Sequence, residues 1–190
     1  RPGQAPEGRF FPDTYAHGKG DSDVRILSRA MKAMDRQLAN AWLARAERNE
    51  LTTAEQALIL ASIVEKETGK ASDRRMISSV FHNRLRVGMP LQTDPTVIYG
   101  MGEAFDGNLR RRDLQTDHPW NTYTRKGLPP TPISMPGKAA LLAAVQPERS
   151  QAFYFVARGD GSSEFSANLE DHNAAVDRYQ RRRQPSSTAP

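Results

Sequence analysis

Apolar residues recur every three or four positions along much of the first half of the chain, which is the spacing of helices with one buried face. The first such segment is predicted to form a long helix that begins after Asp21 or Ser22 and ends at about Arg48. Either residue can cap it, because a short polar side chain accepts hydrogen bonds from the free N–H groups of the first turn. Its apolar positions are Val24, Ile26, Leu27, Ala30, Met31, Met34, Leu38, Ala41, Trp42 and Leu43.

The second periodic segment carries the sequence ASIVEKET at residues 61–68. Thr52 precedes it, and Glu55 follows three residues later. This is the spacing of a capping box, in which each side chain bonds the other residue's backbone N–H. Gly69 is suited to end the helix, because glycine adopts the backbone conformations that close one. We therefore predict a helix between Thr52 and Gly69.

Two further helices are predicted over residues 72–86 and 138–147, where apolar residues again recur with helical spacing. The segment AFYFVA at residues 152–157 is typical of a strand instead. The sequence EFSAN at residues 164–168 is suited to pair with it, because GDGSS between them favours a tight turn. A β-hairpin is therefore expected near the end of the chain.

The segment from Pro90 to Pro136 is different in kind, since it is rich in Gly, Pro, Thr, Asn and Asp and has no long periodic apolar run. It nevertheless carries Tyr99, Trp120 and Tyr123. A long irregular segment inside a domain is usually functional or mobile, and aromatic anchors favour function. The whole pattern predicts an α+β fold, mostly helical, with a small antiparallel β-sheet and a long irregular segment that forms a groove.

The length of 190 residues fits one domain. We predict that it spans residues 1–184 and that its last helix runs from Asn168 or Glu170 to about Arg183. Residues 185–190 are predicted to be a disordered tail. Because the chain opens with RPGQAPEG, which is typical of a linker, we expect it to be part of a longer protein.

The composition excludes some kinds of catalytic and metal site but does not identify a ligand. The net charge of +5 suits nucleic acid, an anionic membrane or an anionic polymer such as cell-wall glycan. The basic runs at residues 109–113 and 178–184 are most simply solvated helix ends and a tail. The absence of cysteine excludes thiol nucleophiles and thiolate metal sites. The four histidines lack metal-ligand spacing, so neither a metal nor a cofactor is predicted.

Glu65 and Glu67 lie two residues apart on the predicted second helix. Their side chains point about 200° away from each other and cannot act on one substrate as a pair. The predicted polar stripe of this helix runs through Glu55, Ser62 and Lys66 instead. At most one of the two glutamates is therefore expected to carry chemistry.

Glu67 is the better candidate, because helical spacing places it over the aliphatic side chains of Leu60, Ile63 and Val64. Loss of hydration disfavours the charged carboxylate and raises its pKa. A general acid needs such a raised pKa, since it must still hold a proton at neutral pH. The alternative is a residue at the helix boundary that pairs with a nearby arginine or lysine.

The irregular segment offers a set of polar and aromatic side chains on proline-stiffened loops. They lie in QTDPT at residues 92–96, at Tyr99, in NTY at residues 121–123 and in GLPPTPISMPG at residues 127–137. Amides and hydroxyls bond sugar hydroxyls, and flat rings cover pyranose faces, so the set is consistent with a sugar-binding groove. A merely structural loop, in which these residues satisfy turns, explains it equally well.

Several motifs together resemble one family. They are EGRFFPDTY, LASIVEKET, VFHNRLRVGMPLQTDPTVIYG, NTY, GLPPTPIS, YFVA and the pair His172-Asn173. In this order and spacing they are similar to the endolytic murein transglycosylase family, the MltG or YceG-like proteins of bacterial cell envelopes. The similarity runs from about Glu7 to about Tyr179. Arg9 and Met135 depart from residues that are common in this family.

The resemblance implies a lytic transglycosylase that cuts nascent peptidoglycan between MurNAc and GlcNAc, leaves a 1,6-anhydro-MurNAc end and limits strand length. Glu67 is implied as the single catalytic acid and base. The implied partners are glycan strands and peptidoglycan synthases such as penicillin-binding proteins, with no nucleic acid and no cofactor. The substrate-binding candidates, from motif position and chemistry, are Gln92, Asp94, Thr96, Tyr99, Asn121 and Tyr123.

The resemblance also implies a periplasmic catalytic domain held at the bacterial inner membrane by one N-terminal helix. That helix and most or all of a preceding LysM-like domain are expected to lie outside this sequence.

Two alternatives stay open at the level of sequence. A lysozyme-like hydrolase needs a second carboxylate, for which Asp94 is the first candidate, ahead of Asp106, Asp113 and Asp117. A non-enzymatic module, either a wall-glycan adaptor or a basic nucleic-acid binder, rests mainly on charge.

Overall fold

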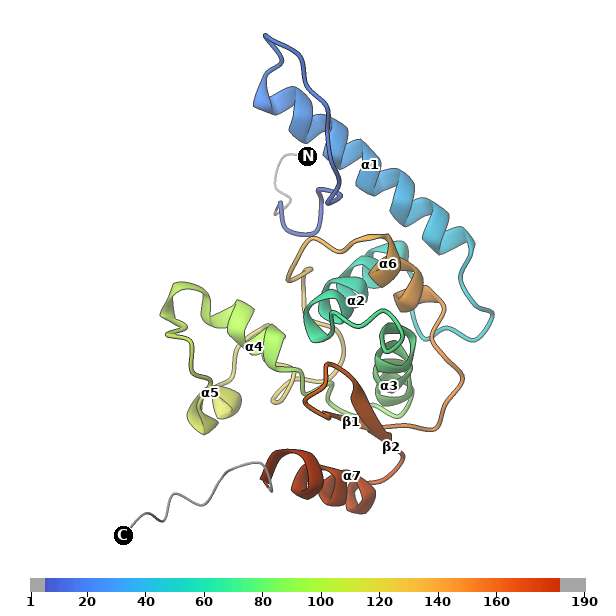
Figure 1. Cartoon of the computed structure of the whole chain (residues 1–190), viewed down its shortest axis with the longest axis vertical. Helices are drawn as coiled ribbons and strands as arrows, with labels where there is room; N and C mark the ends of the chain where they lie inside the picture. Colours follow the sequence, from blue (N-terminus) through green and yellow to red (C-terminus); the bar gives the residue numbers. More distant parts are fainter. Residues whose placement is uncertain (1–5, 182–190) are drawn as a thin grey trace.

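Helix α2 (Ala54–Glu67) lies at the centre of the computed structural model, which describes residues 6–181 (Figure 1). Helices α1 (Asp23–Leu43), α3 (Arg74–Arg86) and α6 (Lys138–Val145) pack against it. Every residue from Ala57 to Val64 is buried, so α2 is enclosed on all sides rather than along one stripe. A helix that is apolar all round belongs in the interior of a domain.

Ser62 was predicted on a polar stripe of α2, and this prediction is wrong because the side chain is fully buried. Its hydroxyl donates to the carbonyl oxygen of Ile59 at 2.7 Å and accepts from the N–H of Ile133 at 2.9 Å. A buried polar group keeps its place only when it is hydrogen-bonded. Ser62 therefore ties the loop before α6 to the central helix.

The cap of α2 lies one residue later than predicted, at Thr53, whose hydroxyl accepts from the N–H of Gln56 at 3.2 Å. The side chain of Gln56 in turn accepts from the N–H of Thr52 at 2.7 Å. Glu55 does not take part, because it forms an ion pair with Arg9, with one N–O distance of 2.9 Å. The helix ends at Glu67, before Gly69 as predicted.

Helix α1 begins after Ser22, whose side chain caps it, but ends at Leu43 rather than at about Arg48. The chain turns after Leu43 because residues 46–49 form hydrogen bonds with the last residue of α6. The N–H of Ala46 and the side-chain amide of Asn49 both donate to the carbonyl oxygen of Val145, at 2.9 and 2.8 Å. These bonds satisfy a carbonyl that the end of a helix leaves free.

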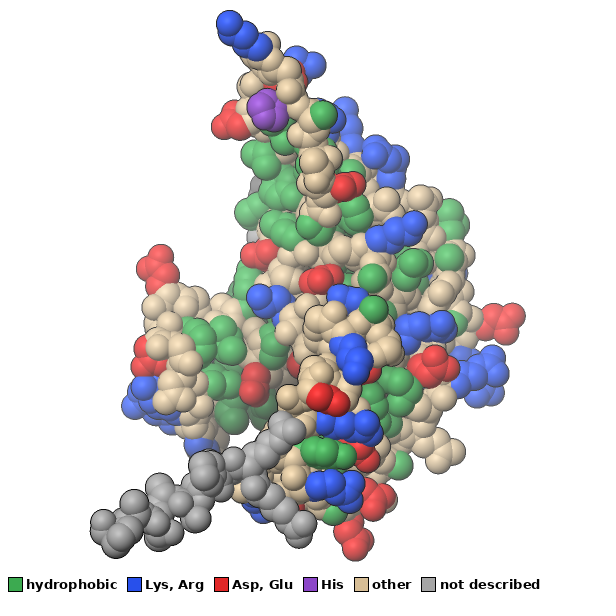
Figure 2. Space-filling model, in the orientation of Figure 1, with side chains coloured by type: hydrophobic (Ala, Val, Ile, Leu, Met, Phe, Trp, Pro, Cys, Tyr) green, Lys and Arg blue, Asp and Glu red, His purple; other side chains and the backbone are tan. Residues whose placement is uncertain are grey.

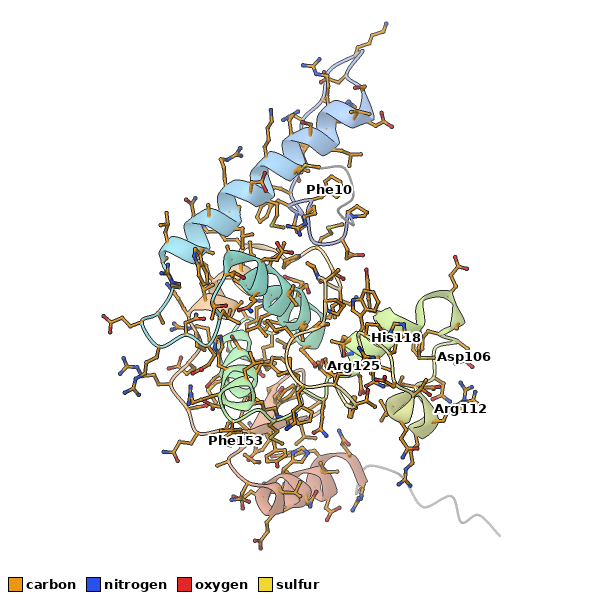
Figure 3. The ribbon with its side chains drawn as sticks, turned by 180° about the vertical axis from the view of Figure 1, so that it is seen from behind. Phe10, Asp106, Arg112, His118, Arg125 and Phe153 are labelled. Carbon is orange, nitrogen blue, oxygen red and sulfur yellow. The ribbon has the colours of Figure 1, made fainter. Side chains whose placement is uncertain are left out.

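The segment from Pro90 to Pro136 is only partly irregular, contrary to the prediction. It contains α4 (Asp94–Met101), a short 3₁₀ turn η1 (Gly102–Ala104) and α5 (Arg111–Gln115). The five residues of α5 are too few to show a helical repeat, and α4 contains Pro95 and Gly100, which are typical of loops. The lobe formed by α4, η1 and α5 carries Asp106 and Arg112 on its outer side, away from α2 and α3 (Figure 3).

The C-terminal part confirms the predicted hairpin and helix. Strands β1 (Tyr154–Ala157) and β2 (Ser163–Ser166) pair antiparallel, with Phe155 opposite Phe165. Helix α7 (Leu169–Val176) follows, capped by Asn168, and leads into a π-helical turn η2 (Asp177–Arg181). The predicted end at Arg183 and the predicted tail at 185–190 lie outside the described residues. The fold is α+β, as the sequence pattern predicts.

Basic and acidic side chains are scattered over the face drawn in Figure 2. No helix within residues 6–181 combines the length and the apolar character needed to cross a lipid bilayer.

Candidate active site

A groove of about 580 Å³ opens beside the end of α2. One wall comes from the end of α2, from α3, from residues 91–94 and from Tyr123. The opposite wall comes from β1, α7 and the turn that follows α7. The volume is within the range of about 300–1,000 Å³ that is usual for ligand sites.

Glu67 is the last residue of α2, and its carboxyl group lines this groove. The hydroxyl of Thr93 donates a hydrogen bond to its Oε1 atom. Burial raises the pKa of Glu67 to about 7, because the charged form loses hydration. The negative charge of Asp94 raises this pKa further, whereas the hydrogen bond from Thr93 and the positive charge of Arg84 lower it. The raised pKa predicted from helical spacing is thereby confirmed. Near pH 7 such a carboxyl can both give and take a proton.

The competing interpretation of Glu67 was an ion pair at the helix boundary. No arginine or lysine within residues 6–181 forms a salt bridge with its carboxyl group. Glu67 is therefore held by a neutral donor, which leaves its proton available.

Glu65 has a different task, as the helical geometry requires. Its Oε2 atom accepts a hydrogen bond of 2.9 Å from the N–H of Gly137, directly before α6. The first N–H groups of a helix need such acceptors. Glu65 therefore fastens α6 to α2, and the two glutamates do not share a site.

Gln92, Asp94 and Tyr123 line the groove together with Glu67, as the sugar-binding prediction requires. The hydroxyl of Tyr123 donates to the carboxylate of Asp94. Burial, with the hydrogen bond to Asp94, raises the pKa of Tyr123, so this hydroxyl stays protonated at neutral pH. Gln92 has a backbone φ of 51°, a left-handed conformation that is uncommon outside glycine and clusters at functional sites.

Thr96 and Tyr99, two other predicted binding residues, do not line this groove. The side chain of Thr96 is fully buried, and its hydroxyl donates to the carbonyl oxygen of Thr93 at 2.7 Å. Tyr99 packs against Trp120, with ring centres 5.8 Å apart. Their positions indicate that they support the loops around the groove.

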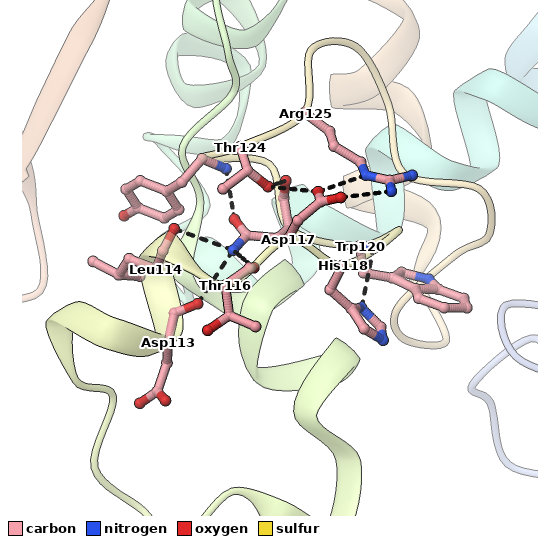
Figure 4. Close-up of polar contacts among 10 residues, drawn as sticks. Asp113, Leu114, Thr116, Asp117, His118, Trp120, Thr124 and Arg125 are labelled. Atoms are coloured by element: carbon pink, nitrogen blue, oxygen red, sulfur yellow. Dashed lines mark hydrogen bonds and ion pairs between the residues drawn. The ribbon is translucent and has the colours of Figure 1, made fainter.

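Asn121 is also absent from the groove, and it is only 1% exposed. Its amide nitrogen donates to the carbonyl oxygens of Asp113, Leu114 and Thr116 at 3.2, 3.1 and 2.7 Å (Figure 4). Its amide oxygen accepts from the N–H of Tyr123 at 2.9 Å. Asn121 therefore joins the end of α5 to the loop that carries Tyr123 into the groove.

Replacing Asn121 with alanine is expected to lower the free energy of unfolding by about 2–3 kcal/mol, because buried backbone groups lose their partner. Urea unfolding measures the loss. Asn108→Ala is the matched control, since Asn108 is exposed on the same lobe. Equal stability of the two variants would contradict the role given to Asn121.

Asp106, Asp113 and Asp117 bond to residues of their own segment rather than to groove residues. Asp106 pairs with Arg110 at 2.6 Å, and Asp117 pairs with Arg125 at 2.8 Å (Figure 4). Asp113 accepts from the N–H of Arg110 at 2.8 Å. Of the four aspartates considered as a second carboxylate, Asp94 alone lines the groove with Glu67.

Sequence reasoning gave no role to Arg84, which lines the groove from α3. A signal was present, because Arg84 follows Ile77, Val80 and Phe81 by seven, four and three residues and so belongs to the apolar face. Its Nε atom donates to the carbonyl oxygen of Phe153 at 2.7 Å. It thereby joins α3 to the segment that enters β1.

The described residues contain no group of three or more His, Asp or Glu side chains placed to hold a metal. His82 illustrates a structural use of histidine: its Nδ1 atom accepts from the N–H of Glu50 at 3.2 Å, and its Nε2 atom lies 2.8 Å from the carbonyl oxygen of Ala144. Burial lowers the pKa of His82, which favours the neutral ring that this pattern needs.

Residues 3–178 match the YceG-like family. The chain belongs to this family. An endolytic murein transglycosylase of Bacillus subtilis (strain 168) is 36% identical over 173 residues, which cover 91% of this YceG-like chain and 48% of that protein. The endolytic murein transglycosylase of Streptococcus pneumoniae serotype 2 is 32% identical over 175 residues, covering 90% and 31%. The chain thus spans about half or less of the length of these curated relatives.

A solved structure supports the same family. The crystal structure of a YceG-like protein from Listeria monocytogenes matches this YceG-like chain with a TM-score of 0.77 and 40% sequence identity. The match covers 89% of this chain and 55% of the other. The α+β arrangement described above is therefore that of a YceG-like domain.

Proposed function

We propose that this YceG-like chain is the catalytic domain of an endolytic peptidoglycan lytic transglycosylase, which cuts the β-1,4 linkage between MurNAc and GlcNAc within a strand. The names of the Bacillus and Streptococcus relatives support murein as the substrate. One observation carries the proposal for the chemistry: Glu67 lies in a groove with a pKa of about 7 and without a basic partner among the described residues.

The reaction needs only one such group. Ordinary glycosidases use two carboxyl groups, one of which activates water or attacks the sugar. In a transglycosylase the C6 hydroxyl of the MurNAc unit attacks its own anomeric carbon. Glu67 protonates the glycosidic oxygen, and the bond from this oxygen to C1 breaks with its electron pair on the leaving sugar. The Glu67 carboxylate then takes the proton of the C6 hydroxyl as the anhydro ring closes, so no water is consumed.

The neighbours of Glu67 suit the charge that develops on the sugar. The negative charge of Asp94 faces an oxocarbenium-like state and favours it. Tyr123 holds this carboxylate in one orientation through its hydrogen bond. The amide of Gln92 is placed to bond sugar hydroxyls in the same groove.

The test is a product analysis by mass spectrometry with defined, uncrosslinked glycan strands. We expect products lighter by one water than those of hydrolysis, with 1,6-anhydro-MurNAc ends. Asp94→Asn is expected to slow the cutting while the anhydro ends remain. Reducing MurNAc ends that disappear in Asp94→Asn would instead assign a lysozyme-like hydrolase, with Asp94 as the second carboxylate.

We also infer a setting for this activity from the family resemblance. The chain would act in the periplasm as part of a protein anchored in the bacterial inner membrane, next to peptidoglycan synthases, where cutting new strands limits their length. Cell fractionation and crosslinking of the full-length protein test this setting. Recovery of the full-length protein away from membranes would contradict it.

A further inference from the structure

Arg84 carries a positive charge inside the molecule, and all of its described hydrogen-bond partners are uncharged. Its side chain lines the groove although the residue is only 6% exposed. The Nη1 atom donates to the carbonyl oxygens of Pro90 and Leu91, at 3.2 and 2.8 Å, and to the amide oxygen of Gln92 at 3.3 Å. With the bond from Nε to Phe153, two of the three guanidinium nitrogens are occupied.

The third nitrogen, Nη2, has no acceptor within residues 6–181. It is also not enclosed by protein atoms. It therefore reaches the open space of the groove. No described carboxylate lies within salt-bridge distance of Arg84. A buried guanidinium without a counter-ion is costly, and a planar fork with a free nitrogen is suited to bind a carboxylate.

The two acids of the groove do not form a salt bridge with Arg84. Glu67 keeps much of its proton at neutral pH and accepts from Thr93. Asp94 accepts from Tyr123. Arg84 therefore has a free position for an anion that a substrate brings into the groove.

A second unsatisfied group, on His172, contacts the same tyrosine ring as Arg84. The guanidinium carbon of Arg84 lies 5.2 Å from the ring centre of Tyr154, and this ring stacks on His172 with centres 5.1 Å apart. The Nδ1 atom of His172 is enclosed and has no hydrogen-bond partner in the described part of the chain; its Nε2 atom also has none there and is not enclosed, so Nε2 is the nitrogen that can reach the groove. Burial and the charge of Arg84 lower the pKa of His172, so the ring is neutral at pH 7 and can donate one N–H.

We propose that Arg84 and His172 form a carboxylate subsite in the groove, which selects glycan strands by an anionic group on the substrate. This inference rests on the proposed function and adds the substrate feature that the groove recognises. Peptidoglycan offers this chemistry in two places. The D-lactyl group of MurNAc ends in a carboxyl that is free where the peptide has been removed, and the stem peptides carry carboxylates of their own.

The decisive experiment changes the substrate and leaves the subsite intact. Binding is measured with the Glu67→Gln variant, which is expected to cut the strands at least about 100-fold more slowly, and cutting is measured with the unsubstituted protein. One pair of substrates is peptide-free strands with the lactyl carboxyl free or converted to a methylamide. The other pair is peptide-bearing strands with the stem carboxylates free or amidated.

We expect neutralisation in one pair to raise Kd and KM by about 10- to 100-fold, the range for a charge-assisted hydrogen bond. The pair that responds identifies the source of the carboxylate. If neither pair responds while anhydro products still form, the subsite is refuted and the proposed function stands. If strands bind with this preference but anhydro products never form, the proposed chemistry fails and the subsite stands.

Variants supply a second line of evidence. Arg84→Gln and His172→Phe, which keeps the stacking ring, are expected to remove the preference for the free carboxylate. Arg86→Gln is the matched control, since Arg86 lies on the same helix, pairs with Glu50 at 2.7 Å and does not line the groove. A preference that survives both groove variants would overturn the proposal. If Arg84→Gln does not fold, His172→Phe and the two substrate pairs still decide.

Discussion

Replacing Glu67 with glutamine is expected to slow glycan cutting by about 10²- to 10⁴-fold, the contribution of a positioned general acid and base. Glutamine has nearly the same shape and can still accept the hydrogen bond from Thr93, but it has no proton to exchange at the glycosidic oxygen. The measurement is the initial rate at which anhydro ends appear on uncrosslinked strands at saturating substrate, so that a change in binding does not disguise the result.

Glu65→Gln is the matched control, because it makes the same substitution two residues earlier on the same helix. The glutamine oxygen can still accept from the N–H of Gly137, so cutting should proceed at nearly the original rate. Equal losses in the two variants would indicate damage to α2 rather than loss of an acid. Full activity in Glu67→Gln would remove Glu67 from the mechanism.

The same Glu67→Gln substitution is expected to stabilise the protein, and the gain should depend on pH. The folded-state pKa of about 7 lies above the ordinary value of 4.5. Below both values the carboxyl is protonated in the folded and unfolded chains and contributes no difference. As the pH rises between them, only the unfolded chain releases the proton, so stability is lost and the full cost is present above pH 7.

The size of this effect follows from the two pKa values. At about 1.4 kcal/mol for each pH unit, glutamine should gain about 3 kcal/mol more at pH 8 than at pH 4. Urea unfolding of both proteins at several pH values measures the difference. A gain that is the same at every pH would show that the raised pKa of Glu67 is not what limits stability.

The position of Glu67 could be predicted because helix geometry is regular. Spacing along α2 places the residue over buried aliphatic side chains, and the structure has Ile63 and Val64 fully enclosed there. Glu65, on another side of the helix, bonds the start of α6. Where a repeat fixes the direction of a side chain, the sequence alone separates two similar residues.

The loop residues could not be sorted in this way. Gln92 and Tyr123 face the groove. Asn121 lies between them in sequence, but its amide nitrogen donates to three carbonyl oxygens instead. An asparagine has the same donors and acceptor in either role, and no period tells which partners a loop will bring. Helix α4 escaped prediction because it contains Pro95 and Gly100, which are typical of loops, although proline is tolerated in the first turn of a helix.

Arg84 shows what a composition-based view overlooks. An arginine on the apolar face of a helix is easily read as a solvated charge near the helix end, although its long stem can be buried while its head bonds distant backbone. Here that head reaches the segments before β1 and before α4. Only the fold brings those carbonyl oxygens to it.

The two walls of the groove come from widely separated parts of the chain, and this sets the order in which the groove is assembled. Synthesis from the N-terminus delivers Glu67 before β1 and α7, which come from residues 154–176. Under the proposed function, a nascent or prematurely ended polypeptide holds the acid without a place for a sugar. Under the same proposal, cutting of the cell wall is withheld until the segment with β1 and α7 has been made and has folded.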